Sequence, residues 1–240
     1  MYTKPNADPK NLFKPNLLNG SLEFDVQLGA QDCGCVAAFY QVNMPTKDEE
    51  GKTVPGKDGN YYCDANGVGG AFCPEFDIME ANKYSWRTTA HTCEDPSGRG
   101  FFSDCDRKGL AKDADEWGSG EYGPSGSKIN TPEFFHLKMD YCKSMFGNWE
   151  GYNLHLSQGQ LCTFTCKGNL KDTGTYFKKL DKPLNEGMAF VFSNWGSEKD
   201  DLSWLNHDKC TGACNDDSFF ILSNFEFKTE KTGSRLFCGI

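Results

Sequence analysis

Residues 74–82 place three carboxylates within six positions and interleave them with apolar side chains. The first two acids, Glu75 and Asp77, alternate with apolar residues, which predicts a β-strand with one apolar face and one acidic face. Strict alternation would turn Glu80 to the opposite face, because it lies an odd number of positions after Glu75. One β-bulge between Asp77 and Glu80 corrects this, so we expect a bulged strand with all three acids on one surface.

Three carboxylates on one strand face suit the cleavage of a glycosidic bond. A retaining glycosidase uses two carboxyl groups about 5 Å apart, one as nucleophile and one as acid/base. A third carboxylate separates their protonation states, because charge repulsion raises one pKa and a shared proton keeps the nucleophile ionised. The alternative is an acidic strand without a role in a chain of net charge −9. Crowded acids repel and destabilise a strand, so we favour a functional site.

The remainder of the chain predicts an all-β protein. Alternating segments occur at 22–28, 134–141, 152–156 and 221–227. The continuous apolar run at 188–192 predicts a strand covered on both faces. Helical periodicity is limited to short stretches at 108–117 and 176–180. We expect a concanavalin-like jelly-roll sandwich of two packed antiparallel sheets.

Length, charge and cysteine content further restrict the class of protein and its compartment. A chain of 240 residues suits one β-sandwich domain over residues 1–240, with 1–16 as a candidate irregular arm. The net charge of −9 excludes a nucleic-acid partner, whose phosphates need clustered Lys and Arg. Twelve cysteines predict disulfides and an oxidising compartment. No apolar run is long enough to span a membrane, and no secretory signal is present, so we expect a secreted chain whose signal has been removed.

The sequence EFDIMEAN at 75–82 resembles the catalytic strand of glycoside hydrolase family 7, the fungal cellobiohydrolases and endoglucanases. His91 stands eleven residues after Glu80, as a histidine does in that family. Family 16 glucanases share the carboxylate triplet, and the offset to the histidine makes the resemblance to family 7 more specific. The resemblance implies Glu75 as nucleophile, Asp77 as its helper, Glu80 as acid/base and His91 as a neighbour of the cleavage site.

The resemblance continues in patches from about residue 17 to 234 and implies four substrate-binding residues. Tyr40 stands where the family has a site tyrosine, and Arg107 where it has an arginine that contacts glucan on the product side. Trp195 and Trp204 stand where the family carries two sugar-stacking tryptophans, a role that suits the negative face of an aromatic ring. Core packing is the alternative for each tryptophan.

The chain also departs from the family pattern. The family domain is longer, and its N-terminal portion, with outer sugar-binding tryptophans and strands of both sheets, has no counterpart ahead of residue 16. Val36, Met79 and Thr211 replace an asparagine, a tryptophan and an arginine. We therefore expect a shortened and divergent relative with an open cleft, which argues against a closed tunnel.

By the same resemblance we expect the disulfides Cys33–Cys214, Cys63–Cys73 and Cys93–Cys105, with the other six cysteines unassigned. A metal site at His207, Cys210 and Cys214 is an alternative, but the spacing is not that of common zinc sites. We predict no metal and no cofactor.

Together these features predict a monomeric, secreted, retaining endo-β-glucanase that hydrolyses β-1,4 (cellulose-type) or mixed-linkage glucan. A non-catalytic, lectin-like glycan-binding protein on the same fold is the second hypothesis, and a secreted structural protein is the third. Release of reducing ends from glucan separates the first from the other two. The sequence leaves the linkage, the chain length and the oligomeric state open.

Overall fold

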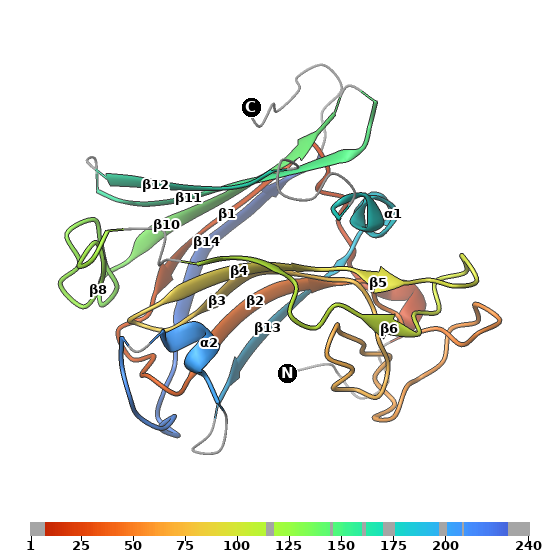
Figure 1. Cartoon of the computed structure of the whole chain (residues 1–240), viewed down its shortest axis with the longest axis horizontal. Coiled ribbons are helices and arrows are strands. Elements are labelled where there is room, and N and C mark those ends of the chain that lie inside the picture. The colour runs from red at the N-terminus through yellow and green to blue at the C-terminus, as the bar shows by residue number, and fades with distance from the viewer. Residues whose placement is uncertain are drawn as a thin grey trace.

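Two five-stranded antiparallel sheets lie one over the other (Figure 1). The computed structural model describes residues 8–113, 118–144, 146–159, 162–169, 176–196, 201–207 and 209–229, with the backbone alone for residues 10 and 162–169. The expected all-β sandwich is confirmed. Among the described residues no helix has the length and apolarity needed to cross a membrane.

The first sheet has the strand order β12-β11-β10-β1-β14. Its strands are β1 (Ser21–Gln27), β10 (Phe135–Lys143), β11 (Trp149–Gln158), β12 (Cys162–Asn169) and β14 (Ile221–Lys228). The second sheet has the order β13-β2-β3-β4-β7. Its strands are β2 (Val36–Val42), β3 (Glu75–Ala81), β4 (Trp86–His91), β7 (Leu110–Asp113) and β13 (Ala189–Trp195).

Short elements cover the ends of the sandwich. Two small ribbons pair β5 (Cys93–Glu94) with β6 (Asp104–Cys105) and β8 (Tyr122–Gly123) with β9 (Ile129–Asn130). The helical elements are the 3-10 turn η1 (Pro9–Asn11), α1 (Lys178–Glu186) and α2 (Ser203–Asn206). In Figure 1, α2 lies beside β2, β3 and β4, close to the end of β13.

The core fills the space between the two sheets. On β1 the alternating residues Leu22, Phe24 and Val26 are fully buried, and Phe39 on β2 and Phe76 on β3 meet them from the other sheet. This is the burial that the period-two pattern predicts, because alternate side chains of a strand point to the same face. The second sheet thereby presents its other face to the site described below.

One expected element is wrong, and another is present but covered only in part. The run at 188–192 lies mostly in β13, an edge strand. Ala189 and Val191 are buried on one face and Phe190 packs against the core on the other, whereas Phe192 is 44% exposed. The segment 108–117 contains strand β7 at 110–113, where hydrogen bonding to β4 outweighs a weak helical pattern; residues 114–117 lie outside the described part. The helix expected near 176–180 is present as α1.

A group of five phenylalanines, which we call the aromatic edge, lies where both sheets end on the same side. β13 and β14 are the edge strands there, and their rings contact one another across the two sheets. The members are Phe13, Phe190, Phe192, Phe225 and Phe227. Phe225 and Phe227 are each 38% exposed, so the apolar interior reaches the surface at this edge.

Four disulfides join described residues, and one expected pairing is wrong. Cys63–Cys73 and Cys93–Cys105 are present as expected. Cys33 bonds Cys210 rather than Cys214, and Cys35 bonds Cys214. The physical reason is the close approach of two backbones: a Cβ on Gly34 would lie 2.5 Å from the carbonyl oxygen of Gly212. The cysteines on both sides of Gly34 therefore lie against the loop at 210–214, and each bonds a different cysteine of that loop.

Candidate active site

Strand β3 contains the expected bulge. Across β3 and β4, Asp77 pairs with Thr89 and Glu80 pairs with Arg87, so two residues of β3 lie opposite the single residue Thr88. Ile78 and Met79 are both fully buried in the core between the sheets. The Thr88 hydroxyl donates a hydrogen bond of 3.0 Å to the Ile78 carbonyl, which satisfies a backbone acceptor at the bulge.

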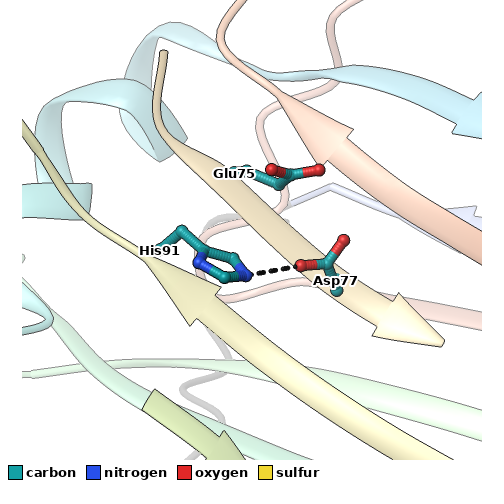
Figure 2. A group of neighbouring side chains, drawn as sticks. All are labelled: Glu75, Asp77 and His91. Atoms are coloured by element: carbon teal, nitrogen blue, oxygen red, sulfur yellow. Dashed lines mark ion pairs between the residues drawn. The ribbon is translucent and has the colours of Figure 1, made fainter. Parts of the chain in front are cut away.

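The bulge brings Glu75, Asp77 and Glu80 to the same cleft. Figure 2 shows Glu75 and Asp77 on β3, with the ring of His91 beside them. Glu75 and Asp77 are only 6% and 4% exposed, whereas Glu80 is partly open to the cleft. The Ala65 N–H donates a hydrogen bond of 2.8 Å to Glu75 Oε2, and the Thr89 hydroxyl donates to Glu80 Oε2 at 3.3 Å.

His91 shares a proton with Asp77. Its Nδ1 lies 2.8 Å from the backbone carbonyl of Asp106, which can only accept, so Nδ1 carries a hydrogen. Its Nε2 lies 3.0 Å from Asp77 Oδ2 (Figure 2). One proton therefore lies between these two atoms, either on a neutral Asp77 that donates to the imidazole or on an imidazolium that donates to the carboxylate.

All three carboxyl groups bind protons more tightly than usual. Burial, together with the charge of Asp64, raises the pKa of Asp77 to about 8. Burial and the charge of Asp77 raise the pKa of Glu80 to about 8, while His91 and Arg87 oppose the rise. Burial and Asp77 also raise the pKa of Glu75, and the Ala65 N–H favours its charged form. The cluster thus holds protons at neutral pH.

The cleft beside these acids has a volume of about 480 Å³. Besides the three acids, its lining includes four more residues implied by the family resemblance, namely His91, Arg107, Trp195 and Trp204. The two tryptophan rings stack on each other with centroids 6.3 Å apart, and Trp195 is 40% exposed. The guanidinium of Arg107 lies over the ring of Phe72, 5.3 Å from its centroid.

Tyr40 lies beside the acids without lining the cleft. It is the cross-strand partner of Asp77 and is 7% exposed. Its hydroxyl is 2.9 Å from the hydroxyl of Tyr62. Burial raises the pKa of Tyr40, and the charges of Glu75 and Asp77 add to the rise, so this phenol is neutral next to the carboxylates. Its expected contact with substrate stays a prediction, as do the roles of the other site residues.

Sequence reasoning missed several residues of the cleft, namely Asn66, Arg87, Thr89 and Lys108. A signal was present for two of them. Arg87, Thr89 and His91 stand two positions apart on one strand, so the period of two that placed the acids also places these three on one face.

The metal site considered at His207, Cys210 and Cys214 is wrong, because both thiols are consumed in disulfides. Among the described residues, Glu75, Asp77 and His91 could offer ligand atoms that lie within 4.8 Å of one another. In the structure Glu75 accepts a hydrogen bond from the Ala65 N–H, and His91 Nε2 is paired with Asp77.

The chain is similar in sequence to curated fungal endoglucanases, whereas no protein-family model matches it. It is 23% identical to "Endoglucanase type C" of Fusarium oxysporum, over 83% of this chain and 57% of that protein. It is 26% identical to the "Probable endo-beta-1,4-glucanase celB" of Aspergillus fumigatus, over 91% of this chain and 62% of that protein. The chain thus spans about three fifths of the length of these relatives.

Solved cellulase structures share the fold. The endocellulase EGI of Humicola insolens has a TM-score of 0.68 at 18% identity, covering 91% of this chain and 69% of that one. A family 7 cellobiohydrolase from Daphnia pulex has a TM-score of 0.59 at 21% identity, covering 80% of this chain and 61% of that one. Taken together, the sandwich, the acid-bearing strand and these likenesses make the chain a divergent relative of the glycoside hydrolase family 7 cellulases.

Proposed function

We propose that the chain is a secreted retaining endo-β-glucanase that cleaves β-1,4 or mixed-linkage glucan. The observation that carries the proposal is the bulged strand β3, which sets Glu75, Asp77 and Glu80 side by side in an aromatic-walled cleft. The likeness to proteins named endo-β-1,4-glucanase supports the substrate class. The four disulfides support action in an oxidising compartment.

In the proposed first step Glu75 attacks the anomeric carbon while Glu80 protonates the leaving oxygen. Glu80 suits the acid because its pKa of about 8 keeps it protonated at neutral and acidic pH. The productive state requires Glu75 to be the member of the cluster that loses its proton. The Ala65 N–H and the nearby charge of His91 both stabilise that carboxylate.

In the second step Glu80, now a carboxylate, removes a proton from water, which attacks the glycosyl–Glu75 ester and releases the sugar with net retention. Asp77 holds Glu75 in place throughout, and His91 holds Asp77 through their shared proton. The exposed face of Trp195 offers a platform for a sugar ring. This chemistry needs neither a metal nor a cofactor.

The test is reducing-sugar release from amorphous cellulose, mixed-linkage glucan, laminarin and xyloglucan. We expect activity on one of the first two and a loss of about 10³-fold or more in kcat for Glu75→Gln, since the covalent step is then removed. Trapping with a 2-fluoro glycoside, followed by peptide mass spectrometry, should place the adduct on Glu75. Full activity of Glu75→Gln on every accepted glucan would contradict this assignment.

Glucan binding without any release of reducing ends would instead identify a lectin-like protein on the same fold. Three crowded, buried carboxyl groups give a binder no advantage, because their burial destabilises the fold. We therefore propose hydrolysis rather than binding alone.

A further inference from the structure

Arg87 connects the acid-bearing strand to the aromatic wall of the cleft. On β4 it pairs with Glu80 of β3 on one side and with Asp113 of β7 on the other. Its side chain is 19% exposed and lines the cleft. Nη1 donates a hydrogen bond of 2.8 Å to the Trp204 carbonyl and lies 3.3 Å from Asp113 Oδ1. The guanidinium carbon also lies 5.6 Å from the centroid of the Trp204 ring.

Trp204 depends on such contacts, because it stands on the four-residue helix α2, which is too short to be stable alone. The helix is anchored by the fully buried Leu205 and by Asn82, whose side-chain amide donates to Asn206 Oδ1 at 2.8 Å. These anchors fix the backbone of α2. The Trp204 indole itself contacts Trp195, with ring centroids 6.3 Å apart and 22° between the planes, and the guanidinium of Arg87.

We propose that Arg87 is a positioning residue that fixes the Trp204 ring against Trp195 and thereby sets where a sugar ring lies in the cleft. The proposal rests on the proposed function and adds to it a residue outside the family resemblance. Arginine suits the task because its guanidinium donates to the Trp204 carbonyl, pairs its charge with Asp113 and lies over the indole. A lysine supplies the charge without that combined geometry.

The charge of Arg87 gives a second, separable effect. Burial and Asp77 raise the pKa of Glu80, and Arg87 opposes that rise. Removal of the charge therefore raises the pKa of Glu80 further. Since Glu80 must be protonated to act as the acid, the alkaline limb of kcat/KM should move to higher pH.

Two variants separate position from charge. We expect Arg87→Ala and Arg87→Lys both to raise KM for the accepted glucan by about 10-fold, since a charge-assisted hydrogen bond and an aromatic contact are lost. Only Arg87→Ala should shift the alkaline limb upward, because Arg87→Lys keeps the positive charge. Unchanged KM in both variants would overturn the positioning role.

A measurement without substrate keeps this test independent of the proposed function. Acrylamide quenching of tryptophan fluorescence should increase in Arg87→Ala, and the increase should be absent when Trp204→Phe is the background. Unchanged quenching in Arg87→Ala overturns the positioning role whatever the activity. If the wild-type chain cleaves and binds none of the glucans while quenching still increases, the proposed function fails and the sugar-placing part of this inference fails with it.

Discussion

Three carboxyl groups of one strand face differ because each has different neighbours. Glu75 is buried and accepts a backbone N–H, Asp77 shares a proton with His91, and Glu80 is partly open and contacts a hydroxyl. A buried N–H donor stabilises a carboxylate, whereas an open position gives access to a leaving group and to water. The proposed division between nucleophile, helper and acid/base follows from these surroundings.

At the residue scale we predict that Glu80→Gln loses about 10²- to 10⁴-fold in kcat on glucan, as expected for loss of a general acid/base. An aryl glycoside with an acidic phenol leaving group needs no proton in the first step, so its glycosylation rate should fall far less. Azide, which needs no general base, should accelerate turnover of that aryl substrate by the variant. Glycosyl azide of retained configuration, identified by NMR, checks the prediction. Equal losses on both substrates would contradict the role of Glu80.

The sequence predicted the acids and His91, but their surroundings depend on contacts between distant segments. Ala65 precedes Glu75 by ten residues and reaches it through a loop rather than through a strand register. Arg87 was recoverable from its alternation with His91. Its contact with Trp204 spans 117 residues of chain, and no local pattern encodes such a contact.

At the element scale the decisive feature is one extra residue in β3. Without the bulge, the period of two would bury Glu80 in the core and turn Met79 into the cleft. The bulge could be predicted because the proposed catalysis requires all three carboxylates on one face of the strand. The edge position of β13 could not, since an apolar run has the same appearance in a covered strand and in the aromatic edge.

Thr88 supports this bulge, and we predict that Thr88→Val destabilises the fold by about 1–3 kcal/mol. The substitution keeps the shape but leaves the buried Ile78 carbonyl and the Trp86 indole N–H without their hydroxyl partner. Thr88→Ser is the matched control and should stay close to wild type. Urea denaturation followed by circular dichroism measures the difference, and equal stability of the two variants would show that the bulge needs no such support.

At the scale of the whole molecule, burial of acids makes stability depend on pH. The pKa of Glu80 rises from 4.5 to about 8 and that of Asp77 from 3.8 to about 8. At a pH between the unfolded and the folded pKa of such a group, the unfolded chain has released a proton that the folded chain retains. The free energy of unfolding therefore falls as pH rises through this window. We predict a Tm several degrees lower at pH 8 than at pH 5. Calorimetry across this range checks it, and Glu80→Gln should show a weaker dependence.

The aromatic edge gives a second property of the whole molecule. Rings that belong to the inside of a sandwich reach solvent along two edge strands, and contiguous apolar surface of this kind binds apolar dyes. We predict that the folded chain increases the fluorescence of the dye ANS. Phe225→Ser with Phe227→Ser should lower it, and Phe146→Ser, at an exposed ring outside this edge, is the control. Equal fluorescence in all three proteins would contradict the prediction.

The two disulfides beside Gly34 constrain the chain differently from two independent crosslinks. A single crosslink leaves a loop free to rotate about the bond, whereas two crosslinks from one short segment, Cys33–Cys210 and Cys35–Cys214, remove that rotation. The clamped loop follows directly after α2, which carries Trp204. The position of the loop that follows Trp204 is thereby tied to the oxidation state of the protein, because reduction of both bonds frees this loop from Gly34 while Leu205 and Asn82 still hold α2.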